Sequence, residues 1–178
     1  MKAKVELHNI GMKYQSPNGE INALENINLT VYDREFVCIV GPSGCGKSTL
    51  LSIMSGLLPP TSGYLLLNGE KITGTSKKIG YMLQKDHLFG WRTILENVLL
   101  GLEIQKAITP ETKARAAELL KTYGLYEFRN KYPNQLSGGM RQRAALIRTL
   151  MTDPEILLLD EAFSALDYQT RLAVTEDI

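Results

Sequence analysis

Gly41-Pro42-Ser43-Gly44-Cys45-Gly46-Lys47-Ser48-Thr49 is the stretch from which the rest of this chain can be understood. It has the form G-x-x-x-x-G-K-[ST], which is typical of a phosphate-binding loop. The apolar, partly β-branched residues 35–40 predict a buried strand before the loop, and residues 50–54 predict a helix after it. Strand, glycine-rich loop and helix in this order favour nucleotide binding over a glycine-rich turn that matches by chance.

The residue types of this loop suit a nucleotide's phosphates. Glycines let successive backbone N–H groups face phosphate oxygens, and the positive end of the helix dipole adds attraction. Lys47 supplies a mobile positive charge for the β- and γ-phosphates, and the Ser48 hydroxyl is placed to bind Mg²⁺. The loop alone does not say which class of nucleotide-binding protein contains it.

Composition limits the class of protein. The 178 residues are 44% hydrophobic and 22% charged, which is typical of a globular protein with a sizeable core. With 20 basic and 19 acidic residues, the net charge of +1 gives no electrostatic reason to expect nucleic acid or an anionic membrane surface as the main partner.

There is no membrane-spanning apolar run and no secretory leader, so we expect a cytoplasmic protein. Cys38, expected as a small strand hydrophobe, and Cys45, in the loop, form no metal-binding pattern.

The pattern elsewhere predicts both sheet and helix. Residues 5–14 and 27–31 read as strands separated by a turn, and Asn68-Gly69 predicts a hairpin. Together they indicate a small antiparallel sheet beside a parallel core, to which residues 80–84 add a short strand. From 93 to 152 the apolar period becomes helical. Thr109 and Ser137 are the expected N-caps of two helices, and Gly124 the stop of the first.

A second group of chemical residues follows an apolar strand at 156–159. Asp160 comes at the tip of that strand and is expected to hold Mg²⁺ through water. Glu161 is then expected to orient or deprotonate an attacking water. An acidic strand end that merely faces solvent is the structural alternative, and the phosphate-binding loop earlier in the chain favours the functional interpretation.

Leu136-Ser137-Gly138-Gly139-Met140-Arg141-Gln142-Arg143 predicts a second anion-binding surface. A serine cap followed by two glycines exposes backbone N–H groups where a helix begins. A glycine-bearing helix entrance without a ligand explains the pattern equally well from physical arguments alone. Because one domain rarely needs two phosphate cradles, this one hints at a neighbouring molecule's nucleotide.

Taken in order, these segments resemble the conserved motifs of ABC transporter ATPases. The Walker A, Q-loop, signature, Walker B and D-loop motifs correspond to residues 41–49, Gln84, 136–142, 156–161 and Ser164-Ala165-Leu166-Asp167. The resemblance covers essentially the whole chain, and LSGG followed by R-Q-R is far more specific than a phosphate-binding loop alone. It implies an α/β fold with a P-loop NTPase (RecA-like) core, a small antiparallel β subdomain and an inserted α-helical subdomain. The implied single domain has its core and β subdomain at 1–86 and 153–178, and its helical subdomain at about 87–152.

The resemblance also implies ATP and Mg²⁺ as cofactors and assigns roles. Tyr14 corresponds to the aromatic residue that stacks on adenine, although a strand-core tyrosine is the alternative. The implied catalytic residues are Glu161, Gln84 and Lys47, and the implied metal-binding residues are Ser48, Gln84 and Asp160. The remaining nucleotide contacts are Gly41, Pro42, Ser43, Gly44, Cys45, Gly46 and Thr49, and the signature contacts to a partner's ATP are Leu136, Ser137, Gly138, Gly139, Met140 and Gln142.

The mechanism implied by the resemblance needs partners. Two such domains form a head-to-tail homodimer with ATP between them, in which Ser137 and Gly139 contact the partner's γ-phosphate and Asp167 lies at the seam. Closure on ATP and opening after hydrolysis drive integral membrane permease subunits, with a solute-binding protein as an indirect partner. No nucleic acid is implied. The expected location is the cytoplasmic face of the plasma (inner) membrane, as a peripheral protein.

Trp91-Arg92-Thr93, shortly after Gln84, narrows the resemblance to the nitrate/sulfonate/taurine importer branch. A lone structural role for Trp91 is the alternative, and the transported solute cannot be read because other subunits select it. A soluble ABC-type ATPase acting on DNA or ribosomes usually inserts long coiled coils, which the short stretch from Gln84 to Ser137 lacks. A simple nucleotide kinase leaves the LSGG stretch without a role.

The resemblance is incomplete at the C-terminal end. A switch histidine that contacts the γ-phosphate is expected beyond a further strand, whereas the sequence ends at Ile178, and His8 and His87 lie in the wrong places for that role. We therefore expect a C-terminally incomplete sequence, an inactive fragment or one that hydrolyses ATP slowly.

Overall fold

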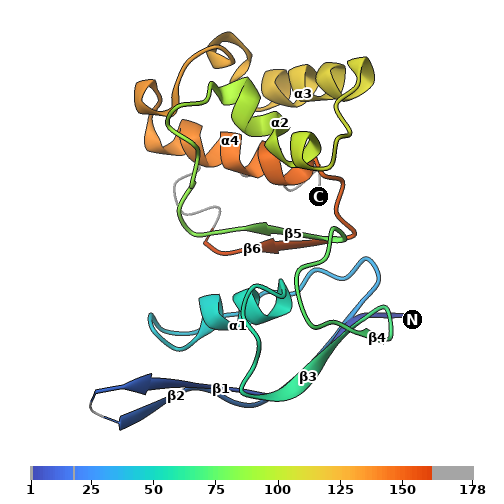
Figure 1. Cartoon of the computed structure of the whole chain (residues 1–178), viewed down its shortest axis with the longest axis vertical. Helices are drawn as coiled ribbons and strands as arrows, with labels where there is room; N and C mark the ends of the chain where they lie inside the picture. The colour runs from blue at the N-terminus through green and yellow to red at the C-terminus, as the bar shows by residue number, and fades with distance from the viewer. Residues whose placement is uncertain (1, 18, 162–178) are drawn as a thin grey trace. The chain divides into compact units, whose positions relative to one another are not determined.

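The computed structural model describes residues 2–17 and 19–161. Its contacts divide the chain into two compact units, Met1–Ser76 (unit 1) and Lys77–Ile178 (unit 2), and each is described by itself (Figure 1). The four residues assigned to the D-loop, Ser164 to Asp167, lie outside the described part of the chain. Among the described residues, no helix has the length and apolar character needed to cross a membrane.

Unit 1 is built on a long antiparallel hairpin. Strands β1 (Ala3–Ser16) and β2 (Gly19–Tyr32) pair along their length, and β3 (Ser62–Leu67) and β4 (Glu70–Lys71) extend the sheet in the order β2-β1-β3-β4. This confirms the predicted antiparallel sheet and the Asn-Gly hairpin turn.

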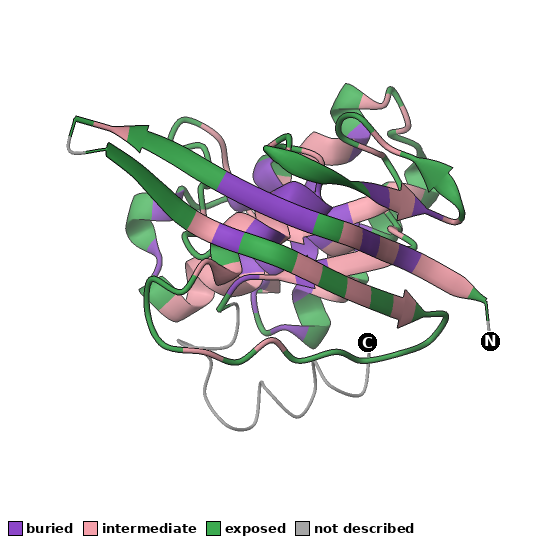
Figure 2. Cartoon of the chain, turned by 90° about the horizontal axis from the view of Figure 1, so that it is seen from below, coloured by how far each residue is buried: buried purple, intermediate pink, exposed green. Residues whose placement is uncertain are grey.

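Strand β1 carries much of the buried surface of unit 1. Val5 and Leu7 alternate with partly exposed neighbours, as expected for a strand with one covered face. Register shifts after Leu7 then break the alternation, so that Ile10 to Met12 are buried consecutively, which Figure 2 shows as a continuous buried stretch in mid-strand.

The prediction of a buried strand at residues 35–40 is wrong. No strand is assigned there, and Phe36 and Val40 are 79% and 87% exposed. Cys38, expected to be a strand hydrophobe, is exposed as well. A parallel strand is stable only when neighbouring strands satisfy its backbone groups, and in the described part of the chain every strand pairing involves other residues. The helix predicted after the loop does form, as α1 (Lys47–Met54).

In residues 77–161, the part of unit 2 that the structure describes, a two-stranded parallel sheet combines with three helices (Figure 1). Strands β5 (Ile79–Met82) and β6 (Ile156–Leu159) pair in register from end to end. Helix α4 (Gly138–Leu150) contacts β5, α2 (Ile94–Ile104) and α3 (Pro110–Thr122). Two short 3₁₀ turns, η1 (Tyr126–Phe128) and η2 (Pro133–Gln135), lead from α3 to α4.

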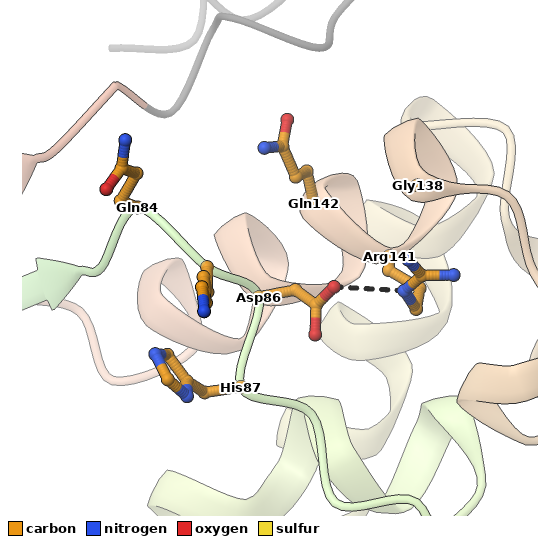
Figure 3. A pocket seen from close by; sticks show the side chains of 7 residues that line it. Gln84, Asp86, His87, Gly138, Arg141 and Gln142 are labelled. Atoms are coloured by element: carbon orange, nitrogen blue, oxygen red, sulfur yellow. Dashed lines mark hydrogen bonds and ion pairs between the residues drawn. The ribbon is translucent and has the colours of Figure 1, made fainter.

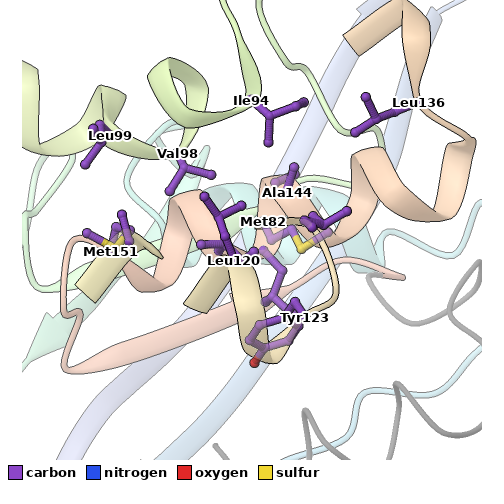
Figure 4. Close-up of a cluster of buried hydrophobic side chains, with 14 of the residues drawn as sticks. Met82, Ile94, Val98, Leu99, Leu120, Tyr123, Leu136, Ala144 and Met151 are labelled. Carbon is purple, nitrogen blue, oxygen red and sulfur yellow. The ribbon is translucent and has the colours of Figure 1, made fainter. Parts of the chain in front are cut away.

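The core of unit 2 lies between these helices (Figure 4). Ile94, Val98 and Leu102 line one face of α2, as the helical period predicts, and each is at most 6% exposed. They meet a cluster drawn from β5, α3, α4 and the residues directly after these two helices, which includes Met82, Leu120, Tyr123, Leu125, Ala144, Leu146, Ile147 and Met151. The core therefore fixes α4, whose first residues carry the predicted second anion-binding surface.

The two ends of α3 follow the predicted signals. Thr109 caps α3 by accepting a hydrogen bond from Thr112 N, and Gly124 ends the helix with a φ of 66°. Helix α2 has a reciprocal capping box, in which the Glu96 carboxylate accepts from Thr93 N at 2.7 Å. This backbone N–H, with the Thr93 hydroxyl, holds the pKa of Glu96 below its usual value.

Candidate functional site

In unit 1 two glycines of the glycine-rich loop have a left-handed backbone. Gly44 and Gly46 have φ angles of 80° and 94°, in the region where side-chain-bearing residues are strained. Gly46 is also the N-cap of α1, and no side chain caps that helix, whereas Thr93, Thr109 and Ser137 cap α2, α3 and α4. The N-terminal N–H groups of α1 can therefore meet an anion.

Lys47 lies against its own loop. Its Nζ donates hydrogen bonds to the carbonyls of Gly41 at 2.8 Å and Pro42 at 2.9 Å, and a longer one to Cys45 Sγ at 3.8 Å. These contacts hold the ammonium group beside the backbone that would surround phosphate oxygens. A lysine in this place acts as a point charge that can exchange its carbonyl partners for phosphate.

The structure brings Tyr14 to the same site. The Tyr14 and Thr49 hydroxyl oxygens lie 3.4 Å apart, so the strand β1 and the first turns of α1 meet through these side chains. Tyr14 is 40% exposed and therefore is not a strand-core residue. An exposed aromatic ring beside a phosphate-binding loop can stack on a base. Ser48 lies in the first turn of the same helix.

In unit 2 the ends of β5 and β6 hold the predicted carboxylates and amide. Asp160 N donates to Met82 O at 3.0 Å, which continues the parallel pairing beyond the strands. Gln84 Nε2 donates to Glu161 Oε2 at 2.7 Å. Two side chains 77 positions apart in the sequence are thus brought together, as expected at the carboxyl ends of neighbouring parallel strands.

Asp160 fits the site of a hard cation. It is 4% exposed, and among the described residues it is the only Asp, Glu, Lys, Arg or His that is fully buried. A buried carboxylate is costly unless a cation or hydrogen-bond donors compensate it. The described residues contain no group of three His, Cys, Asp or Glu suited to a metal, and Mg²⁺ does not require one, because it keeps several waters and takes one or two protein oxygens.

The first turn of α4 is arranged as predicted for the second anion-binding surface. The Ser137 hydroxyl accepts a hydrogen bond from Met140 N at 3.3 Å. Ser137 and Gly138 are exposed, Gly139, Met140 and Gln142 are partly exposed, and Leu136 is anchored in the core at 5% exposure. Exposed N–H groups at a capped helix start leave the alternatives of a ligand site and a simple helix entrance open.

A hollow of about 440 Å³ joins the Gln84 segment to the start of α4. Figure 3 shows Gln84, Asp86 and His87 on one side of it and Gly138, Arg141 and Gln142 on the other. An ion pair between Arg141 Nε and Asp86 Oδ2, 2.9 Å long, crosses this space. The Q-loop and signature positions of unit 2 therefore share one polar pocket.

The sequence analysis did not predict three residues that hold the backbone near this pocket. Asn97 is fully buried in α2 and binds the backbone at Phe89, Arg92 and Thr93, while Arg141 and Arg148 of α4 bind the segment after Gln84. Asn97 carries a readable signal, since it is a polar residue inside the apolar stripe of an amphipathic helix. Arg141 lies in the R-Q-R stretch, but neither its pattern nor that of Arg148 indicates a bond to the Asp86 segment, because helix faces are ordinarily rich in arginine.

Comparison with known proteins gives the same assignment. Residues 24–164 match the family model for ABC transporters. An uncharacterized ABC transporter ATP-binding protein of Bacillus subtilis is 51% identical over 90% of this chain and 62% of its own length. A taurine import ATP-binding protein of Pelagibacter ubique is 44% identical over 92% and 62%, and a nitrate import ATP-binding protein of a Synechocystis species is 42% identical over 94% and 63%. The chain thus spans a little over three fifths of the length of these relatives.

Solved structures agree. The ATP-binding cassette MJ0796, in a dimeric post-hydrolysis state with ADP and Pi, superposes with a TM-score of 0.88 at 38% identity, covering 97% of this chain and 80% of that one. A second dimeric structure of the same cassette gives a TM-score of 0.89. The fold class is therefore α/β of the P-loop NTPase kind, as predicted. The chain belongs to the ABC transporter family, among its ATP-binding cassettes.

Proposed function

We propose that this chain is the nucleotide-binding part of an ATPase subunit that energises an ABC importer. The observation that carries the proposal is the start of α1, where a left-handed Gly46, a helix without a side-chain cap and the Lys47 ammonium lie together. Tyr14 contacts this helix and would stack on adenine. We further propose one ATPase domain, with core and β subdomain at 1–86 and 153–178 and a helical subdomain at about 87–152.

Within this proposal the loop residues 41–49 hold the phosphates of ATP, with Lys47 on the β- and γ-phosphates. Ser48, Gln84 and Asp160 are the residues that would hold Mg²⁺. When bound, this ion would neutralise the negative charge that develops on the phosphates. Glu161 orients and deprotonates the attacking water. The hydrogen bond from the Gln84 amide fixes the direction of the Glu161 carboxylate and supports this role.

We propose that a second copy completes the site. In the proposed head-to-tail dimer, Ser137 and Gly139 of one copy contact the γ-phosphate bound by the other, and Asp167 lies at the seam. The exposed, capped start of α4 and the similarity to a cassette described as dimeric support this arrangement.

The proposed partners are integral membrane permease subunits and, indirectly, a solute-binding protein, with the chain at the cytoplasmic face of the plasma membrane. Support comes from relatives named as taurine and nitrate import proteins and from Trp91, which is 74% exposed and free to contact a partner. The proposed cargo class is a small anion or organic solute of the nitrate, sulfonate or taurine kind.

Lys47→Ala tests nucleotide binding. Losing the charge-assisted hydrogen bonds to phosphate should weaken MgATP binding roughly 10- to 100-fold in titration calorimetry. Lys71→Ala, at an exposed lysine of β4 in the same unit, is the matched control and should bind like the wild type. Absence of MgATP binding by the wild-type chain, or equal binding by both variants, contradicts the proposal.

Coupling to transport is tested by purification from membranes. A tagged chain expressed in its source organism should be recovered with an integral membrane subunit after detergent extraction, identified by mass spectrometry against an untagged control. Recovery with ribosomes or DNA instead would support the soluble ABC-type ATPase and exclude the importer.

A further inference from the structure

The segment that follows Gln84 is held by side chains of α4. Arg148 Nη2 donates to Asp86 O at 2.7 Å, and its Nη1 donates to His87 O at 2.8 Å. Arg141 Nε donates to the Asp86 carboxylate at 2.9 Å. Residues 86 and 87 belong to no strand or helix, so these two guanidinium groups replace the backbone pairing that regular structure would provide.

Arg141 joins this segment to the beginning of α4. While its Nε binds Asp86, its Nη1 donates to Leu136 O at 2.8 Å, directly before the N-cap Ser137. The planar guanidinium fixes the directions of both bonds, which a lysine cannot do. One side chain thus connects the segment 84–87 (the Gln84 segment) with the first turn of α4, which carries the signature residues and is called the signature helix below.

Holding residues 86 and 87 in this way costs free energy, because a guanidinium is buried and a backbone conformation is strained. Burial lowers the pKa of the Arg148 guanidinium, and the Asp86 carboxylate opposes that shift. His87 has a φ of 43°, an unfavourable backbone for a residue with a side chain. Such strain persists only where surrounding contacts over-determine the conformation, and it concentrates at functional segments.

The Gln84 side chain is bound at the end of β6 and not to α4. Its amide donates to Glu161, which follows β6, whereas residues from Asp86 onward are bound to α4. Only Lys85 separates the two attachments. A displacement of α4 relative to the sheet must therefore move the Gln84 side chain relative to Glu161.

We propose that Arg141 and Arg148 are positioning residues that tie Gln84 to the start of α4, so that the position of the signature helix sets the contact between Gln84 and Glu161. This rests on the proposed function only in giving Gln84 a role toward Mg²⁺ and ATP. The structural part of the proposal concerns unit 2 alone.

Hydrogen exchange tests the structural part. Arg148→Met keeps an apolar stem and removes both donated bonds, so the amides of residues 86–89 should exchange about 10-fold faster. Amides of α3 should keep wild-type rates. Arg143→Met, on the same helix but without a bond to this segment among the described residues, is the matched control. Unchanged exchange at 86–89, or a uniform rise throughout unit 2, overturns the proposal that Arg141 and Arg148 clamp residues 86 and 87 to α4.

ATP binding with and without Mg²⁺ tests the positioning role. Arg148→Met, Arg141→Lys and Gln84→Ala should each weaken ATP binding about fivefold in Mg²⁺ and leave binding in EDTA unchanged. In the Gln84→Ala background neither change should have a further effect, because the residue that they position is gone. Additive losses, or equal losses in EDTA, refute positioning. A wild-type chain that binds no ATP refutes the proposed function, and the exchange rates then decide the clamp separately.

Discussion

Asn97→Ala is expected to destabilise unit 2 by about 3–5 kcal/mol, a large effect for a single substitution. The side chain is fully buried, and its Oδ1 accepts from Phe89 N at 2.7 Å. Its Nδ2 lies within bonding distance of the carbonyls of Phe89, Arg92 and Thr93, at 2.9 to 3.1 Å. Truncation leaves Phe89 N without its acceptor and Arg92 O without the amide donor, and it opens a cavity beneath α2. Phe89 O and Thr93 O keep the backbone donors Arg92 N and Asn97 N.

Urea unfolding followed by circular dichroism measures this effect. Asn134→Ala, at an exposed asparagine of η2 in the same unit, is the control and should change the free energy of unfolding by about 0.5 kcal/mol or less. Asn97→Asp retains the acceptor for Phe89 N but places a carboxylate against the three carbonyls. It should therefore be no more stable than the alanine variant at neutral pH. A cost of about 1 kcal/mol or less for Asn97→Ala would mean that water replaces the amide.

Much of the fold follows from local signals. Thr93, Thr109 and Ser137 cap helices because their side-chain oxygens satisfy N–H groups that every helix start leaves free, and this requirement depends on sequence alone. The strand at 156–159 was predictable for a similar reason, since a short wholly apolar run between turn signals fits a buried parallel strand. Ser137 lies at the start of α4 and Asp160 directly after β6, as the sequence predicts.

Residues 35–40 show where local signals fail. Their apolar, β-branched pattern states only that they suit a strand, whereas a strand forms when another strand pairs with it. Pairing is a non-local property, and in the described part of the chain no strand pairs with this segment. The residue pattern therefore predicts a tendency that the structure does not realise.

The clamp on the Gln84 segment was unpredictable for a related reason. Asp86 and Arg141 are 55 positions apart, and nothing in either neighbourhood marks them as partners. Their contact depends on β5 and α4 packing together, which places the end of one beside the start of the other. Motifs identified the chemical groups of the site, and only the tertiary packing identified the residues that orient them.

Gly46→Ala is expected to weaken MgATP binding roughly 100-fold and to destabilise unit 1 by about 2–4 kcal/mol. At Gly46 a Cβ would lie 2.7 Å from Ala23 O and 2.9 Å from Leu24 Cδ2, in addition to the strain of a φ of 94°. Because Ala23 O belongs to the backbone of β2, it cannot rotate away. The loop must shift instead, and the N–H groups at the start of α1 then lose their common direction.

Gly44→Ala separates the two causes of this effect. Gly44 has a φ of 80°, yet a Cβ there would meet nothing within 4 Å, so it carries the conformational strain without the clash. We expect it to cost about 1 kcal/mol of stability and to weaken MgATP binding much less than Gly46→Ala. Calorimetric titration and thermal unfolding of both variants measure the difference. Equal losses would show that left-handed backbone alone shapes the loop, whereas a much larger loss at Gly46 would show that contact with β2 holds the phosphate-binding backbone in place.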